Sequence, residues 1–206
     1  MIPAIVLAAG KSTRMGRAKA LLPIAAGETF LARVVRTLRA AGVEDVVVVV
    51  GHDGDAIIEA FDSTPDPLCF VRNPDYEGGQ LTSLLAGLRA IDRPGVEAAL
   101  LTLVDVPLVS PATVRAVVER YRRSRALIVR PVSGSRHGHP VLIDRRLFDR
   151  LRAADPETGA KQVIRAHAST LGDVDVDDEG AFVDVDTQQE YERVFDATRS
   201  VRRPDN

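Results

Sequence analysis

The apolar positions of the chain fall into short runs that alternate with longer segments of helical spacing. The clearest run is 46–50, five consecutive valines followed by Gly51. A β-branched run of this length is typical of a strand that is buried on both faces of a sheet. Similar runs predict further strands at 2–9, 68–71, 98–104, 126–129, 140–143, 171–176 and 182–185.

Between these runs, apolar residues recur every three or four positions, which is the spacing of a helix with one buried face. This spacing predicts helices at 29–41, 53–61, 82–91, 110–122, 145–154 and 159–167. Ser110 and Pro111 are typical of an N-cap and a first helical position. The segment 187–190 (Thr-Gln-Gln-Glu) has the pattern of a capping box and predicts the start of a last helix.

Strands and helices that alternate in this way predict an α/β fold of three layers, Rossmann-like, with a mainly parallel central sheet. A length of 206 residues predicts one domain, which we place at 1–199, followed by a flexible tail at 200–206. In such sheets, ligands bind at the C-terminal ends of the strands. The loops at 10–22, 73–82, 104–110 and 184–187 are therefore expected to carry the site.

The composition narrows the class of protein. A net charge of −2 and an aromatic content of 4% argue against nucleic acid as a partner. No apolar run reaches the length of a membrane span, and the first residues lack a basic leader, so we expect neither membrane association nor secretion. The single cysteine, Cys69, excludes an internal disulfide and predicts a reducing compartment, the cytoplasm. One cysteine and four scattered histidines argue against a structural zinc site.

The charged residues are distributed unevenly. No acidic residue precedes Glu28, whereas Lys11, Arg14, Arg17 and Lys19 fall within nine residues, which suits an anion. From 166 to 192 there is no Lys or Arg but a series of Asp and Glu residues, which suits a cation. Two solvated faces of opposite charge are the simpler explanation of the same pattern.

The first loop contains Gly10-Lys11-Ser12, which resembles part of a phosphate-binding P-loop. A P-loop needs a glycine five residues before Gly10, where this chain has Ile5, and the dinucleotide fingerprint fails because the only glycines here are Gly10 and Gly16. What remains is a turn of small residues at a strand end, followed by spaced cations. Such a loop suits a polyphosphate, although an ordinary basic surface loop has the same composition.

Three carboxylates stand where the predicted sheet would present them to a ligand. Asp105 follows the strand at 98–104, and Asp184 and Asp186 would point to one face of the strand at 182–185. Asp105 and Asp186 together could hold Mg²⁺, which takes one or two carboxylates plus substrate phosphates. The alternatives are a turn-forming role for Asp105 and a favourable interaction of Asp186 with a helix N-terminus.

Two other loops carry polar groups. The segment 73–83 contains two glycines, together with Gln80, Thr82 and Ser83, whose amide and hydroxyl groups suit a base or a ribose. The alternative is a strand-to-helix turn with Thr82 as the N-cap. His137 and His139 have no third ligand nearby, so a substrate-facing loop or a tight turn is favoured over a metal site.

Taken together, these segments resemble the nucleotidyltransferases that activate molybdenum cofactor, the molybdopterin cytidylyl- and guanylyltransferases. The resemblance extends in order from residue 2 to about residue 195. It rests on the motif L-A-A-G-x-S-x-R-M-G with a following lysine at 7–19, and on the segments 73–83, 105–107 (Asp-Val-Pro), 138–140 (Gly-His-Pro) and 184–187. It implies a three-layer nucleotidyltransferase fold and an enzyme that transfers a nucleoside monophosphate, CMP favoured, from a nucleoside triphosphate to the phosphate of molybdenum cofactor. Pyrophosphate would be released.

The resemblance also implies a role for each matching residue. Arg14, Lys19 and Asp105 would be catalytic, and Asp105 and Asp186 would bind Mg²⁺. His139 would face the acceptor. The nucleotide-binding residues would be Leu7, Ala8, Ala9, Gly10, Arg14, Lys19, Gly78 and Ser83.

Several alternatives stay open at the level of the sequence. The start of the first loop and Gly138-His139-Pro140 favour the cytidylyl type, but Val106 matches neither type, so CTP and GTP both remain candidates. An apo-molybdoenzyme would be a further partner. A sugar- or alcohol-phosphate nucleotidyltransferase of the same fold, or a non-catalytic protein that delivers the cofactor, are the other functions compatible with these residues.

Overall fold

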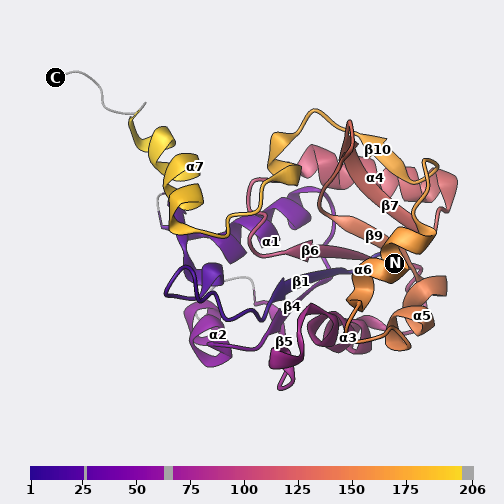
Figure 1. Ribbon diagram of the computed structural model, residues 1–206, viewed down its shortest axis with the longest axis horizontal. Helices are drawn as coiled ribbons and strands as arrows, with labels where there is room; N and C mark the ends of the chain where they lie inside the picture. Colours follow the sequence, from indigo (N-terminus) through magenta and orange to yellow (C-terminus); the bar gives the residue numbers. More distant parts are fainter. Residues whose placement is uncertain (26, 63–66, 201–206) are drawn as a thin grey trace.

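The computed structural model describes residues 1–25, 27–62 and 67–200 and has an eight-stranded sheet at its centre (Figure 1). The strand order is β10-β7-β9-β6-β1-β4-β5, with β8 paired to β7. The strands are β1 (Ala4–Ala8), β4 (Val46–Val50), β5 (Cys69–Arg72), β6 (Ala98–Leu103), β7 (Ile128–Ser133), β8 (Arg136–His137), β9 (Val141–Asp144) and β10 (Asp173–Asp175). Strands β2 (Pro23–Ala25) and β3 (Glu28–Thr29) form a separate antiparallel pair. The tail predicted for 200–206 lies, apart from Ser200, outside the described residues.

The sheet is mostly parallel, as predicted. Strands β6, β1, β4 and β5 run parallel to one another, and β10 runs parallel to β7. All five valines of β4 are buried because this strand lies between β1 and β5, in the part of the sheet that is covered on both faces. Strand β9 is antiparallel to both of its neighbours, β6 and β7, a reversal that the hydrophobic pattern does not encode.

Helices cover both faces of the sheet and make the three predicted layers (Figure 1). Alternate residues of β1 divide the core: Val6 packs in a cluster with α1, α2, α4 and α7, and Ile5 packs in a cluster with α3 and α5, against which α6 also packs. The helices are α1 (Phe30–Ala40), α2 (Gly54–Asp62), α3 (Gln80–Ile91), α4 (Pro111–Ser124), α5 (Phe148–Arg152), α6 (Gly159–His167) and α7 (Gln188–Ser200). No helix among the described residues is both long and apolar enough to cross a membrane.

Two predicted helix starts are confirmed by their caps, and one is wrong. The Ser110 hydroxyl accepts a hydrogen bond from the Thr113 amide at 3.2 Å. At α7, the Glu190 amide donates to the Thr187 hydroxyl at 3.2 Å, and the Thr187 amide donates back to the Glu190 carboxylate at 2.8 Å, which is a capping box. Thr82, in contrast, is not an N-cap: α3 begins at Gln80, and the Thr82 hydroxyl donates within the first turn and the preceding loop.

The strand predicted at 182–185 is also wrong. Residues Glu179–Phe182 form a 3-10 turn, and the chain then runs irregularly through Asp186. The backbone at Gly180 passes so close to the Leu108 carbonyl that a Cβ there would lie 2.2 Å from its oxygen. This approach holds the segment across the end of the sheet rather than beside a strand, and the Val185 amide donates to the Asp105 carbonyl at 2.8 Å.

Asp144, at the end of β9, is a buried carboxylate on which the local fold depends. Only 5% of the residue is exposed, and its oxygens accept hydrogen bonds from the Arg146 amide and guanidinium at 2.8 Å and from the Tyr121 hydroxyl at 3.0 Å. Burial alone would raise the pKa of Asp144, but these hydrogen bonds outweigh it and hold the pKa below its ordinary value.

We therefore expect Asp144→Ala to lower the free energy of unfolding by about 2 kcal/mol, because the Tyr121 hydroxyl loses one of its partners in the core. Since the folded-state pKa is depressed, the contribution of Asp144 is complete above the ordinary pKa of an aspartate and is lost as the pH falls through the folded-state pKa. Urea unfolding at pH 7 and pH 3 measures both effects. Asp149→Ala removes a carboxylate that is 93% exposed and serves as the control, with an expected change within about 0.5 kcal/mol.

Candidate active site

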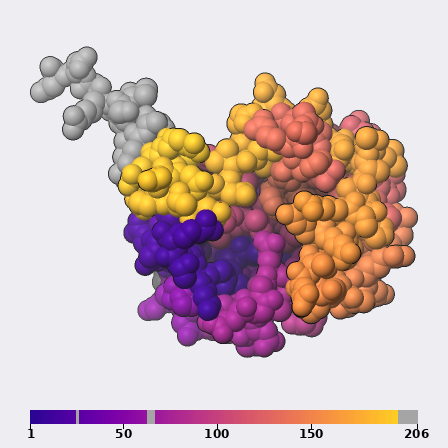
Figure 2. All heavy atoms as spheres, viewed as in Figure 1, coloured from indigo at the N-terminus to yellow at the C-terminus, as the bar shows by residue number. Residues whose placement is uncertain are grey.

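A cavity of about 310 Å³ opens at the C-terminal ends of β1 and β6. Figure 2 shows this face of the molecule hollowed between the indigo N-terminal segment, the magenta segment and the orange segment. All four loops expected from the sequence contribute to the lining. The lining residues are Leu7, Ala8, Ala9, Gly10, Lys11, Ser12, Thr13, Arg14, Ala18, Lys19, Ala20, Tyr76, Gly79, Gln80, Ser83, Leu103, Val104, Asp105 and Asp186.

The first loop is folded so that it directs one lysine into this cavity. The side chain of Met15 is buried in the core and anchors the middle of the loop, and Gly16 has a positive φ of 67°, which glycine adopts readily. The Ser12 hydroxyl accepts a hydrogen bond from the Lys19 amide at 3.2 Å and closes the loop. As a result the Lys19 side chain is almost enclosed, with 12% exposed, whereas that of Arg14 stays at the mouth with 65% exposed.

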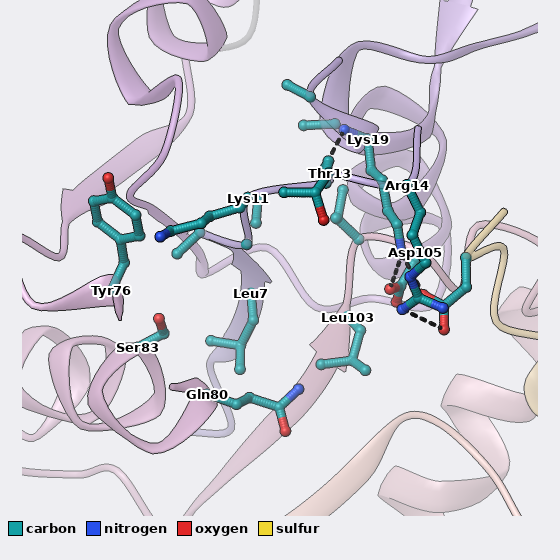
Figure 3. Close-up of a pocket in the computed structure, with 18 of the residues that line it drawn as sticks. Leu7, Lys11, Thr13, Arg14, Lys19, Tyr76, Gln80, Ser83, Leu103 and Asp105 are labelled. Atoms are coloured by element: carbon teal, nitrogen blue, oxygen red, sulfur yellow. Dashed lines mark hydrogen bonds and ion pairs between the residues drawn. The ribbon is translucent and has the colours of Figure 1, made fainter. Parts of the chain in front are cut away.

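Lys19 lies between two of the carboxylates that the sequence singles out, Asp105 and Asp186, and Figure 3 shows its side chain reaching Asp105. Its Nζ is 2.8 Å from an oxygen of Asp105 and 2.5 Å from an oxygen of Asp186, and an Arg14 nitrogen is 3.4 Å from the other oxygen of Asp186. Burial would lower the pKa of Lys19, but the two carboxylates outweigh it and raise the pKa. The hydrogen bond from Lys19 lowers the pKa of Asp186. One end of the cavity is therefore a compact cluster of fixed charges.

A divalent cation fits the oxygens at this end. The second carboxylate oxygen of Asp105, Oδ1, is buried and has no hydrogen-bond partner. A buried anionic oxygen of this kind is a suitable ligand for a hard cation. In the part of the chain that the structure describes, no group of three or more His, Cys, Asp or Glu residues is arranged to hold a metal. The two carboxylates would need oxygens from a substrate to complete the coordination, which is common for Mg²⁺.

The opposite end of the cavity is less charged. Figure 3 shows Tyr76, Ser83 and the head of Lys11 on this side, with Leu7 in the middle. The Ser83 hydroxyl is fixed by the Asn73 side-chain amide, which donates to it at 3.0 Å. Gly78 is not part of the lining: the neighbouring Gly79, with a φ of 94°, takes that place.

His139 lies in a second cavity of about 410 Å³, which shares Leu7, Gln80 and Leu103 with the first. The His139 amide donates to the Ala181 carbonyl at 2.9 Å. Gly138 must be a glycine for this contact, because a Cβ there would lie 2.3 Å from the Ala181 oxygen. Burial lowers the pKa of His139, although the charge of Asp184 opposes this, so the ring is mostly neutral at pH 7.

The structure thus brings Leu7, Ala8, Ala9, Gly10, Arg14, Lys19, Ser83, Asp105 and Asp186 to one cavity, leaves Gly78 beside it and places His139 in the adjoining cavity. Asp184, which the irregular segment carries toward Asp105 and His139, lines neither cavity. Burial and then the charge of Asp105 raise the pKa of Asp184. Tyr76 and Leu103 also line the first cavity, although the sequence does not predict a role for either. The position of Leu103 at the end of a predicted strand is the feature of the sequence that could have indicated its place in the site.

Comparison with known proteins gives a family model, the MobA-like NTP transferase domain, that matches residues 4–171. The chain belongs to this family. The matched stretch includes the first loop, Asp105 and His139, and it ends before Asp186. The sequence resemblance to molybdenum cofactor nucleotidyltransferases is therefore confirmed at the level of the family.

Two curated relatives align with nearly the whole chain. Nicotine blue oxidoreductase of Paenarthrobacter nicotinovorans is 30% identical over 94% of this chain and 96% of its own length. Molybdenum cofactor cytidylyltransferase of Escherichia coli is 25% identical over 92% of this chain and 93% of its own length. The chain spans only about a fifth of another relative, the bifunctional IPC transferase and DIPP synthase of Rubrobacter xylanophilus, with 47% identity over 43% of this chain and 21% of that protein.

Solved structures agree with the fold. A nucleotidyl transferase from Methanothermobacter has a TM-score of 0.78 and 26% identity over 98% of this chain and 99% of that one. Rv0371c of Mycobacterium tuberculosis, in complex with manganese, has a TM-score of 0.70 and 26% identity over 95% of this chain and 98% of that one. The α/β nucleotidyltransferase fold expected from the sequence is confirmed.

Proposed function

We propose that this protein transfers a nucleoside monophosphate from a nucleoside triphosphate to the phosphate of an acceptor, with CTP and molybdenum cofactor as the favoured pair. The observation that carries the proposal is the cluster of Lys19, Asp105 and Asp186 at one end of the first cavity, with Arg14 at its mouth. This set of charges suits a triphosphate with its metal. The second cavity, which adjoins the first, leaves room for an acceptor.

The residues of the first loop would bind the nucleotide. Leu7, Ala8, Ala9 and Gly10 line the cavity and would contact the nucleotide through their backbone groups, and Ser83 lies at the end that suits the base and the ribose. Arg14 and Lys19 would neutralise the phosphate oxygens and the departing pyrophosphate. For Lys19 this requires that its ammonium group leave the two carboxylates when the nucleotide binds.

The transfer itself needs alignment and charge neutralisation more than a general base. A phosphate monoester has its second pKa near 6, so the attacking oxygen is already ionised at neutral pH. A bond forms between this oxygen and the α-phosphorus, the bond from the α-phosphorus to the bridging oxygen breaks, and pyrophosphate leaves with the electron pair. Mg²⁺ bound by Asp105 and Asp186 would supply electrostatic stabilisation at the α-phosphate. The related structure with manganese is consistent with a divalent metal.

Arg14→Ala is expected to weaken nucleoside triphosphate binding by about tenfold, because one charge-assisted contact to a phosphate is lost. Isothermal titration with the triphosphate and Mg²⁺ measures the affinity directly. Arg17→Ala removes an exposed cation of the same loop that does not line the cavity, and it should change the affinity little. Equal affinities for the Arg14 variant and the wild type would show that Arg14 does not bind phosphate.

Pyrophosphate release tests the whole proposal. CTP and GTP are supplied separately with Mg²⁺, each with and without molybdenum-loaded molybdopterin. Release that depends on the pterin and favours CTP is the expected result. Release only with a sugar or alcohol phosphate would support the related transferase function instead. Tight pterin binding without release would support a protein that delivers the cofactor.

An oxidoreductase is the second candidate, because the relative with 30% identity over nearly the whole chain is named as one. The charges of Asp105 and Asp186 favour the transferase. Two carboxylates beside one lysine suit a metal-bound triphosphate, whereas hydride transfer does not need them. Reduction of nicotine blue by an added hydride donor such as NADH or NADPH, in the absence of any pyrophosphate release, would favour the oxidoreductase.

A further inference from the structure

The second cavity has a distinctive charge pattern. Its polar lining includes Arg130, Lys161 and Arg165 together with two histidines, and no Asp or Glu lines it. Arg130 is already neutralised, since its Nε donates to Asp173 at 2.9 Å and its side chain is mostly buried. Lys161 and Arg165 are exposed, and neither side chain forms an ion pair or a hydrogen bond with any residue that the structure describes. The cavity therefore carries two cations that no described residue pairs with.

Helix α6 presents these two cations to the cavity. Lys161 and Arg165 are four residues apart and so lie on one face of the helix, next to Ala160 and Ile164, which also line the cavity. Two like charges at this spacing repel each other unless an anion bridges them. The orange segment in Figure 2, which includes α6, borders the hollow opposite the indigo first loop. Lys161 and Arg165 also border a third, more open hollow that residues of 158–166 line, so they stand at the rim of the second cavity.

The rest of the lining is mainly aliphatic. Leu84, Leu101, Val141 and Ile164 make the walls, and Leu7 and Leu103 form the boundary with the nucleotide cavity. Walls of this kind suit an uncharged part of a ligand. A molecule in the second cavity would thus have one end at the shared boundary, its body between the aliphatic side chains and its far end at α6.

We propose that the acceptor carries a second anionic group besides the phosphate that attacks, and that Lys161 and Arg165 bind this group. The inference rests on the proposed function, because it takes the second cavity as the acceptor site. It defines the substrate class as phosphate monoesters with a largely uncharged body and a distal negative charge. Molybdenum cofactor belongs to this class, since its dithiolate sulfurs and oxo ligands leave the molybdenum end negative. A phosphate ester of a neutral polyol does not belong to this class.

The decisive variant is the double substitution Lys161→Gln with Arg165→Gln in the full chain. Its KM for molybdenum-loaded molybdopterin is expected to rise by about tenfold or more, with KM for CTP and kcat unchanged, because the contact is to the acceptor alone. The conservative pair Lys161→Arg with Arg165→Lys should restore the acceptor KM. Arg122→Gln with Arg123→Gln makes the same change of net charge at exposed positions of α4 and should leave every constant unchanged.

Two further measurements separate this inference from the proposed function. Inositol 1-phosphate is a phosphate monoester without a second anionic group. If the wild type turns over this acceptor in place of the pterin, and the double substitution does not affect that turnover, the inference is overturned while the nucleotidyl transfer stands. Equilibrium binding of the pterin is followed by its fluorescence. Binding that the double substitution weakens, without any turnover in the wild type, would support the inference and refute the transfer. An unchanged acceptor KM in a folded double variant, or no binding of either acceptor by the wild type, would overturn the inference.

Discussion

Asp105→Asn is expected to lower the rate of pyrophosphate release by about 10³-fold or more while the protein stays folded. Asparagine has nearly the same shape as aspartate, so the packing at the end of β6 is retained, and the Asp105 carbonyl that accepts from the Val185 amide is unaffected. The substitution removes the negative charge and replaces the buried, unpartnered oxygen with a neutral group. Catalysis that depends on a cation at this position should therefore be lost.

The measurement combines the rate of pyrophosphate release with thermal unfolding and with the dependence of the rate on Mg²⁺ concentration. Asp177→Asn is the matched control, because Asp177 is an exposed carboxylate of the same acidic segment that lines neither of the two cavities described above. It should retain full activity. A folded Asp105→Asn variant with wild-type turnover and an unchanged response to Mg²⁺ would refute the assignment of Asp105 to the metal.

The fold could be predicted from the sequence wherever burial determined the residue type. The valine run of β4 is buried on both faces, and the helices that cover the sheet show their buried faces in the spacing of apolar residues. The errors lie where long-range contacts override local preference. The segment at 182–185 has the apolar residues of a short strand, but the close approach of Gly180 to Leu108 places it at the end of the sheet without a strand partner. The direction of β9 follows from its neighbours and has no local signal.

The candidate site could be predicted only in part. Strand ends and local charge indicated Lys19, Asp105 and Asp186 separately, and the resemblance to a family grouped them. The ion pairs that join them connect Lys19 to residues 86 and 167 positions away in the chain, and no local pattern specifies such distances. Lys161 and Arg165 carried a signal, two cations four residues apart on a predicted helix, but its meaning depends on the cavity beside α6.

Lys19→Met is expected to change two properties in opposite directions. Turnover should fall by about 10²-fold, because a cation that would stabilise the triphosphate and the departing pyrophosphate is lost. The affinity of the nucleotide-free protein for Mn²⁺ should rise by about tenfold or more. The Lys19 ammonium group now holds both carboxylates, at 2.8 and 2.5 Å, and a divalent ion has to displace it. Two opposite unit charges about 4 Å apart attract each other by about 4 kcal/mol at an effective dielectric constant of about 20. A tenfold gain in Mn²⁺ affinity is therefore a modest share of the attraction to Lys19 that the ion no longer has to overcome.

Titration with Mn²⁺, in the absence of nucleotide, measures the affinity independently of turnover. Arg17→Met is the control for the loss of one positive charge in the same loop, because Arg17 is exposed and does not line the cavity. A rise in Mn²⁺ affinity for the Lys19 variant alone would mean that the lysine keeps the carboxylates neutralised until a nucleotide arrives with its metal. An unchanged or lower Mn²⁺ affinity would mean that Asp105 and Asp186 do not form the metal site. A normal turnover would in turn remove Lys19 from the phosphate-binding residues.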